Sequence, residues 1–286
     1  MKKYFLMVLV LILLVFVLVL IKLPDDNLHI VTCDVGQGDA ILIFKKNTQI
    51  LIDGGPDNKV LNCLSRYMSF WDKRIELVIL THPQSDHFTG LIDVFRKYRV
   101  DMFLANQVDS SSDSYQVLKN EVRGLNLNMI NPKTFMKLKI DNINMEILNP
   151  HELQDYLNKN VLGAFSTKEE LNNFSIVTRF DYGSFSALTT GDMGPSITQR
   201  IIETNKTSDI TFLKVPHHGS KNGLVKDLLL SVNPKIAVIS VGAKNSYGHP
   251  SPEIIKMLED EHIILKRTDL DHDIEVVTDG GKWWVN

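Results

Sequence analysis

The chain has 286 residues, of which 44% are hydrophobic and 23% charged, and it carries only two cysteines. These values exclude a largely disordered chain, and two cysteines are too few for a disulfide scaffold or a zinc site built from cysteines. Residues 1–22 hold three lysines and no acid, so 28 of the 31 basic residues and all 34 acidic residues lie in 23–286. A body this acidic has no bulk attraction to DNA, and any nucleic-acid binding must come from a local patch.

An apolar run over residues 4–21 begins the chain, with lysines at positions 2, 3 and 22. As a helix it would be about 27 Å long, close to the roughly 30 Å hydrocarbon core of a bilayer. The alternative is a cleaved signal peptide, which needs small residues at its cleavage site, and residues 1–31 contain no Ala, Gly or Ser. We therefore predict an uncleaved transmembrane anchor over 1–22. The lysines at positions 2 and 3 favour a cytoplasmic N-terminus, which places the body outside the cytoplasm.

A linker over 23–28 is followed by one predicted domain over 29–286. Runs rich in β-branched residues between glycine and polar turns predict strands, and apolar residues at helical spacing predict helices. In the first half, strands are expected over 29–34, 40–44, 50–52, 77–80, 100–104 and 127–130, and helices over 60–71, 91–98 and 115–122.

The second half begins with a predicted hairpin over 138–140 and 143–148, followed by a polar, irregular stretch over 151–170 that we interpret as an insertion or a mobile loop. Further strands are expected over 175–180, 185–189, 210–215, 236–241, 263–266, 274–277 and 283–285, and helices over 224–230 and 252–260. Strand clusters with intercalated helices predict an α/β (α+β) sandwich of two mixed sheets covered by helices. We see no second domain boundary.

The most informative segment is Thr81-His82-Pro83-Gln84-Ser85-Asp86-His87, directly after an apolar strand. Two histidines and a carboxylate within six residues, on a loop that leaves a strand, can converge on one metal ion. Imidazole nitrogen and carboxylate oxygen suit Zn²⁺, and also Mn²⁺ or Fe²⁺. The alternative is a polar loop whose histidines cap a helix.

Two later segments favour the metal site. Asp192 lies just past one predicted strand, and His217 and His218 lie just past another. Three strand ends that present histidine and aspartate are difficult to explain by packing alone. We therefore predict a metal centre, in which Asp192 is placed so that it could bridge two ions.

Other blocks fit supporting roles. Asp39 or Gln37, in a glycine-containing turn, could support the metal ligands, and Asp53 is a candidate for the same role. His249, just before a predicted helix, could contact a substrate phosphate or protonate a leaving group; the alternative is a histidine that only begins the helix. The two cysteines, Cys33 and Cys63, could pair in an oxidising compartment, but their separation in sequence does not decide it.

These blocks carry a resemblance. The segments DVGQGDAILI (34–43), LIDGG (51–55), THPQSDH (81–87), TTGD (189–192), VPHHGS (215–220) and NSYGHP (245–250) are similar, in this order, to those of the metallo-β-lactamase superfamily. More narrowly, they resemble the hydrolase domain of ComEC-type competence DNA-uptake proteins. The match covers about residues 29–286 and implies a metallo-β-lactamase-like αββα sandwich with the site at one edge of the sheets. The multi-span channel of those proteins is missing from this sequence.

The resemblance also implies a ligand set. Asp86, His87, Asp192 and one of His217 and His218 would hold one metal ion. A second ion, bridged by Asp192, would be held by His82 and the residue at position 84.

The chain departs from the family pattern at one place, and it also lacks the separate third-motif histidine of the superfamily, as this branch often does. Position 84 is Gln84 where the family has His or Asp, and a neutral amide is a poor zinc ligand. The third-motif histidine also has no counterpart, since the matching stretch reads Asn172-Asn173-Phe174-Ser175, which leaves Asn173 and Gln84 as supporting candidates. We therefore expect one tight ion, Zn²⁺ or alternatively Mn²⁺, and a second that binds weakly.

The sequence predicts a membrane-anchored metallohydrolase with Asp86, Asp192 and His249 as catalytic residues. The resemblance points to a phosphodiester substrate, with DNA outside the cell first, and leaves any partner channel unknown. One alternative is a phosphodiesterase acting on small phosphoesters or on cell-surface groups. The other is a non-catalytic binding module that keeps the metallo-β-lactamase fold.

Overall fold

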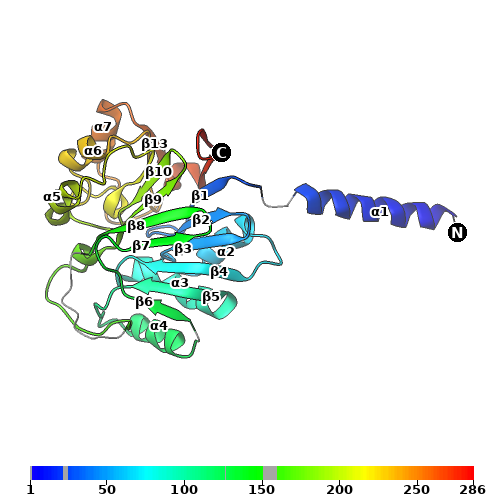
Figure 1. Cartoon of the computed structure of the whole chain (residues 1–286), viewed down its shortest axis with the longest axis horizontal. Helices are drawn as coiled ribbons and strands as arrows, with labels where there is room; N and C mark the ends of the chain where they lie inside the picture. Colours follow the sequence, from blue (N-terminus) through cyan, green and yellow to red (C-terminus); the bar gives the residue numbers. More distant parts are fainter. Residues whose placement is uncertain (1, 22–24, 126, 151–159) are drawn as a thin grey trace.

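The computed structural model describes residues 2–21, 25–125, 127–150 and 160–286. Helix α1 (Lys2–Ile21) stands apart from a body of two sheets and their covering helices (Figure 1). Part of the predicted insertion over 151–170, namely residues 151–159, lies outside the described residues.

The first sheet has eight strands in the order β15-β14-β1-β2-β3-β4-β5-β6. Strand β3 runs parallel to β4, β4 to β5 and β5 to β6, whereas β1, β2, β14 and β15 pair antiparallel. The bounds are β1 Leu28–Thr32, β2 Ile41–Lys45, β3 Thr48–Ile52, β4 Arg74–Leu80, β5 Arg99–Ala105, β6 Asn128–Ile130, β14 Ile274–Thr278 and β15 Trp283–Val285.

The second sheet has seven strands in the order β13-β12-β11-β10-β9-β8-β7. Strands β10 to β13 are parallel, and β7 to β10 pair antiparallel. The bounds are β7 Lys137–Ile140, β8 Ile143–Asn149, β9 Val177–Tyr182, β10 Phe185–Thr189, β11 Phe212–Lys214, β12 Ile236–Ile239 and β13 Ile264–Arg267.

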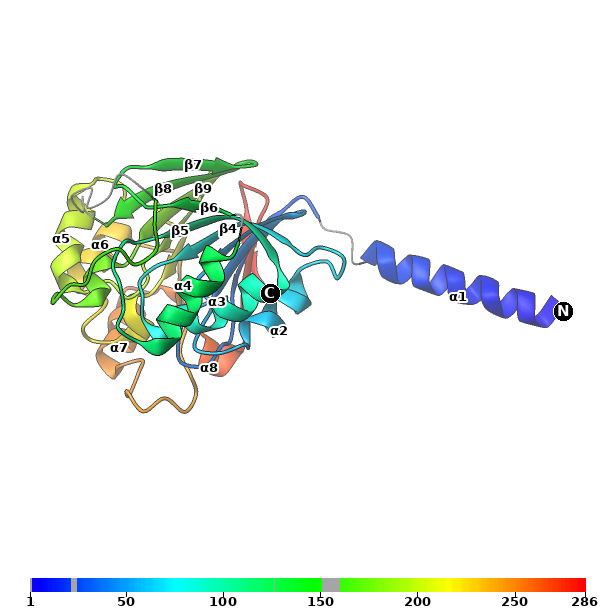
Figure 2. The same cartoon turned by 90° about the horizontal axis from the view of Figure 1, so that it is seen from below.

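Helices cover the outer faces of both sheets, as Figure 2 shows for α2, α3 and α4 beside the first sheet. Helices α5, α6 and α7 pack on the second sheet. The bounds are α2 Val60–Tyr67, α3 Ser85–Lys97, α4 Asp113–Arg123, α5 Pro195–Glu203, α6 Lys226–Val232, α7 Pro252–Asp260, α8 Thr268–Asp271 and two 3-10 turns, η1 Leu171–Phe174 and η2 Pro216–Gly219. The predicted αββα sandwich is confirmed.

Alternation along the strands builds the layers. In β3, Ile50 and Ile52 face the layer between the sheets, whereas Leu51 between them faces the helices. Because successive side chains of a strand point to opposite faces, a run that is apolar on both faces must be covered on both. The central strands therefore lie between a helix layer and the other sheet, with their carboxyl ends at one edge.

Several predicted bounds are wrong. The segment after β4 is not a loop as far as position 87, because α3 begins at Ser85, six residues before the predicted start. The first turn of α3 is polar, so apolar periodicity appears only from Phe88. Helix α2 ends at Tyr67, because Met68 is already extended, and helices α5 and α8 were not predicted.

The predicted anchor falls on α1, for which side chains are described over residues 3–14 only. Over the residues that the structure describes, no helix has both the length and the apolar character that a membrane crossing requires.

A disulfide joins Cys33, which follows β1, to Cys63 in α2, with their Cα atoms 5.9 Å apart. The question that the sequence left open is thereby answered. Both residues are buried in the layer between the first sheet and its helices, and the bridge closes a sequence separation of 30 residues.

We expect the double variant Cys33→Ala/Cys63→Ala to lose about 2–4 kcal/mol of unfolding free energy, because the cross-link constrains the unfolded chain. Chemical denaturation monitored by circular dichroism measures this loss. A reductant should lower the stability of the wild type by a similar amount and leave the variant unchanged. Equal stability of wild type and variant under oxidising conditions would contradict the expectation.

Candidate metal centre

Strand ends from both sheets meet at one edge of the sandwich. Asp53 follows β3, and the Thr81-His82 pair follows the parallel strand β4. Asp192 follows β10, and His218 follows the parallel strand β11. Because parallel strands present their carboxyl ends on the same side, residues far apart in the sequence gather here.

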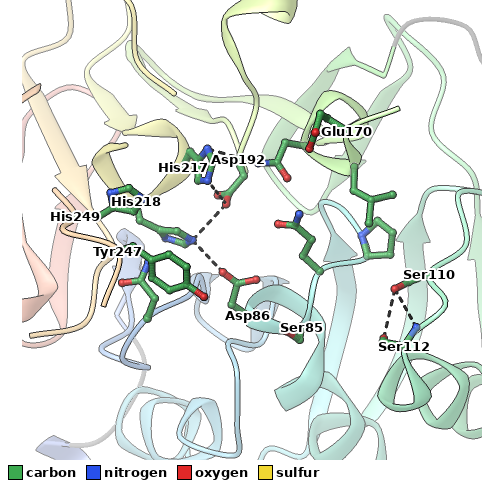
Figure 3. A pocket seen from close by; sticks show the side chains of 15 residues that line it. Ser85, Asp86, Ser110, Ser112, Glu170, Asp192, His217, His218, Tyr247 and His249 are labelled. Carbon is green, nitrogen blue, oxygen red and sulfur yellow. Dashed lines mark hydrogen bonds and ion pairs between the residues drawn. The ribbon is translucent and has the colours of Figure 1, made fainter. Parts of the chain in front are cut away.

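The structure brings Asp86, His87, Asp192 and His218 together, with one possible ligand atom of each within 4.8 Å of the others. His87 Nε2 and His218 Nε2 each lie 3.3 Å from Asp192 Oδ2, and His218 Nε2 lies 3.4 Å from Asp86 Oδ2. Figure 3 shows Asp86 and Asp192 on either side of His218. This set decides between the two neighbouring histidines: His218 belongs to the cluster.

The orientation of both histidines suits a metal ion. His87 Nδ1 donates to Asp53 Oδ2 at 2.7 Å, and His218 Nδ1 donates to the Ser240 carbonyl at 2.9 Å. The Nε2 atoms of both rings are buried and have no hydrogen-bond partner. Imidazoles held through Nδ1 with a free, converging Nε2 are typical of metal ligands. Two imidazoles and two carboxylates fit a divalent ion such as Zn²⁺ or Mn²⁺.

The local backbone is unusual where it positions these groups. His217 and His218 both adopt left-handed conformations, with φ of 52° and 55°. Such conformations cost free energy in residues other than glycine and are concentrated at functional sites. Gly38 is required nearby, because a Cβ there would lie 2.2 Å from the Asp86 carbonyl oxygen.

The residues expected to hold a second ion are arranged differently. His82 Nε2 donates to Gln84 Oε1 at 2.9 Å, so this nitrogen offers no lone pair to a metal in this arrangement. Burial lowers the pKa of His82 to about 4, and the neighbouring His87 contributes in the same direction. His82 is therefore a neutral residue that is paired with Gln84.

The remaining candidates are placed around the cluster. His217 is 27% exposed, with its Nε2 3.9 Å from Asp192 Oδ2. The Asn173 side chain instead accepts from Ser196 Oγ at 2.8 Å, in α5. Its neighbour Asn172, which we did not single out, approaches His217 Nδ1 at 3.5 Å.

Asp39 and Asp53 contact the ligand histidines on the Nδ1 side of their rings, opposite the Nε2 atoms. Asp39 Oδ1 lies 3.3 Å from His218 Nδ1, and Asp53 also accepts from the backbone and the hydroxyl of Thr81 at 2.8 and 2.7 Å. The sequence did not single out Lys214, whose ammonium is ion-paired with Asp39. A signal was present, since a lysine inside an otherwise apolar strand needs a buried partner.

The buried carboxylates set the protonation of the metal-free cluster. Burial alone would lower the pKa values of His87 and His218, but Asp192 and its neighbouring carboxylates outweigh burial and raise both pKa values well above the usual range. Burial would likewise raise the pKa of Asp192, yet His218 and His87 hold it well below its usual value. Both histidines are therefore charged at neutral pH without metal.

The cluster opens into a polar cleft of about 530 Å³. Figure 3 shows Asp86, Asp192 and the histidines on one side, and Ser110, Ser112 and Glu170 on the other. The lining residues are Gln37, Pro83, Gln84, Ser85, Asp86, Ser110, Ser112, Glu170, Leu171, Asn172, Asp192, His217, His218, Tyr247 and His249. The candidate catalytic residues Asp86, Asp192 and His249 thus share one cleft.

Comparisons with known proteins agree with this geometry. The model of the metallo-beta-lactamase superfamily matches residues 33–104. ComE operon protein 3 of Bacillus subtilis is 26% identical over 197 residues, and Recombination protein 2 of Haemophilus influenzae is 28% identical over 235 residues. These alignments cover 69% and 79% of this chain.

Residues 33–104 of this chain are therefore similar to the metallo-beta-lactamase superfamily. The similarity of the chain to competence proteins of the ComEC type confirms the resemblance seen in the sequence. The chain spans about a quarter of the length of these relatives, 24% and 26% respectively. The metallo-beta-lactamase fold protein YhfI from Bacillus subtilis shares the fold, with a TM-score of 0.54 and 12% identity over 91% of this chain and 100% of that one.

Metal binding to the cluster of Asp86, His87, Asp192 and His218 should be coupled to proton release. Because His87 and His218 are protonated in the metal-free cluster, an ion must displace their protons. We expect the affinity for Mn²⁺ to rise with pH between about 6 and 8 and up to about two protons to be released per ion. Calorimetric titration in buffers of different ionisation enthalpy measures both. An affinity independent of pH would contradict the assigned ligands.

Proposed function

We propose that the chain is a metal-dependent hydrolase of phosphodiesters. The observation that carries the proposal is the cluster of Asp86, His87, Asp192 and His218 at the wall of the polar cleft. Its ligand types and the free Nε2 atoms of its histidines support one tightly bound divalent ion. The pairing of His82 with Gln84 supports weak binding of a second.

The residues of the cleft have distinct roles in this proposal. A divalent ion held by Asp86, His87, Asp192 and His218 would supply Lewis acidity for activation of water and of the phosphoryl group. Asp86 is 29% exposed and lines the cleft, so its carboxylate orients the attacking water and accepts its proton. Asp192 is buried and ion-paired with both histidines, so its part is to fix the ligands.

His249 is placed to contact the substrate. Its ring lines the cleft, with its centroid 5.9 Å from that of His217. Burial lowers the pKa of His249, and His217 and His218 lower it further, so the imidazole is neutral at physiological pH. A neutral imidazole donates a hydrogen bond through one nitrogen, which suits a phosphoryl or leaving-group oxygen better than full proton donation.

Two observations bear on whether the substrate is DNA or a small phosphoester. Recombination protein 2 and a further relative, Competence protein ComA of Neisseria gonorrhoeae, have names that refer to recombination and competence, which favours DNA. However, no lysine or arginine is present among the described residues that line the cleft, and Glu170 adds a negative charge. DNA-binding proteins generally use such cations on phosphates. This observation favours small phosphoesters as the second candidate.

Assays with bis-(p-nitrophenyl) phosphate and with plasmid DNA, each with and without divalent ions, test the proposal and separate its versions. Hydrolysis of the small ester alone identifies a small-phosphoester enzyme, and DNA cleavage identifies a nuclease. No turnover of either substrate by metal-loaded protein contradicts the proposal and favours a non-catalytic binding module.

We expect Asp192→Ala to abolish both metal binding and hydrolysis, because it removes the carboxylate that the Nε2 atoms of both histidines approach. His249→Ala should keep the metal and lose about 10²–10³-fold in kcat, the usual effect of losing a donor to the transition state. Asp227→Ala, in the first turn of α6, is the matched control and should leave both properties unchanged. Full activity of the Asp192 variant would mean that the chemistry is assigned to the wrong residues.

We also propose that the chain is anchored in a membrane by its N-terminal apolar segment, with the body outside the cytoplasm. The Cys33–Cys63 disulfide supports this location, because disulfides persist in oxidising compartments. We propose no partner channel for this protein.

For the anchor, we expect the full-length protein to stay in the membrane pellet after carbonate extraction. Protease added to intact cells, or to spheroplasts where an outer membrane is present, should digest the body. A cytoplasmic protein expressed in the same cells is the control for leakage. Recovery of a soluble mature form that begins near residue 24 would contradict the anchor.

A further inference from the structure

Lys214 places a fixed positive charge inside the candidate metal centre. The residue ends β11, and its side chain is completely buried. Its ammonium is ion-paired with Asp39 Oδ2, lies 3.6 Å from Asp192 Oδ1 and donates to the Gly191 carbonyl at 3.0 Å. Asp192 Oδ1 is buried and has no hydrogen-bond partner. The ammonium therefore faces the carboxylate oxygen that points away from the two histidines.

A buried lysine keeps its positive charge only where its partners compensate for the hydration that it has lost. Two carboxylates compensate for it here, since the ammonium is ion-paired with Asp39 and lies 3.6 Å from Asp192 Oδ1. The site therefore holds a permanent cation that none of the proposed catalytic steps uses.

Charge counting shows what this cation does. Asp39, Asp53, Asp86 and Asp192 bring four negative charges when ionised. With Lys214 and one divalent ion, the site keeps one net negative charge. A second divalent ion would leave one net positive charge in a buried site, where uncompensated charge is costly. With the lysine removed, the same two ions would leave the site neutral.

We propose that Lys214 is a positioning residue that limits the centre to one divalent ion, by occupying Asp39 and the outer oxygen of Asp192 with a charge of its own. The inference rests on the proposed metal centre. It goes further, because it assigns the number of ions to a residue that is not a ligand.

Calorimetric titration of the full-length protein with Mn²⁺ alone tests the electrostatic role through a cycle of variants. Lys214→Met removes the positive charge and should tighten the single ion by about tenfold or more. Asp39→Asn leaves the lysine unbalanced beside Asp192 and should weaken the ion by a similar factor. The double variant removes both charges and should return close to the wild-type affinity.

The direction in which each variant changes the metal affinity distinguishes the electrostatic role of Lys214 from a role in packing. A structural lysine would weaken metal binding in every variant, and that result would overturn the proposal. Lys45→Met is the matched control, because Lys45 is also largely buried but lies over the Tyr182 ring, and its metal affinity should be unchanged. Should Lys214→Met fail to fold, Asp39→Asn and the double variant still test the signs.

The number of ions gives an independent readout. Elemental analysis after dialysis should find about one Mn²⁺ per chain in Gln84→His, even though that variant restores a ligand at position 84. The double variant Gln84→His/Lys214→Met should approach two. Two retained ions in Gln84→His alone would overturn the role of Lys214. Wild-type protein that binds no ion would instead overturn the metal centre itself.

Discussion

Four carboxylates gather at one edge of the sandwich, and the rest of the structure depends on how their negative charges are compensated. Asp39, Asp53 and Asp192 are almost fully buried, and Asp86 completes the group at the cleft wall. Each would be strongly destabilised without a partner. The partners differ in kind: two imidazoles for Asp192, an imidazole and a threonine for Asp53, and an ammonium for Asp39. Compensation is therefore built in before any ion binds, so the apoprotein can keep its ligands in place.

The fold supplies this edge because its central strands are parallel on both sides of the sandwich. The turns that follow β3 and β4 are more than 100 residues away in sequence from those that follow β10 and β11. Side chains of the two pairs nevertheless meet, since His87 Nε2 lies 3.3 Å from Asp192 Oδ2. Each ligand histidine is oriented by a neighbour that follows a strand of the same sheet. Asp53 of the first sheet orients His87, and Ser240, past the second, orients His218. Each histidine is therefore held by an element other than the one that carries it.

The sequence predicted the architecture well because strand and helix periodicity reports burial. It also brought the histidines and aspartates together, because they follow predicted strands. It could not choose between His217 and His218, since the choice depends on two successive left-handed residues that no local pattern encodes. Nor could it place Asn173, whose side chain turns toward Ser196, or identify Asp39 as the partner of Lys214, because contacts between the two sheets follow from the tertiary fold. The polar first turn of α3 hid the start of the helix that carries Asp86 and His87.

The direction of the strands also decides where the chain enters the domain. Asp26, just before β1, is ion-paired with Lys46 in the β2–β3 turn at 2.6 Å. This turn precedes β3, and the metal centre follows β3, so the two lie at opposite ends of strands roughly 17–23 Å long. The upstream chain therefore joins the domain on the side away from the cleft. A domain connected in this way can be joined at its N-terminal side to a larger polypeptide without any bulk being placed at the mouth of the cleft.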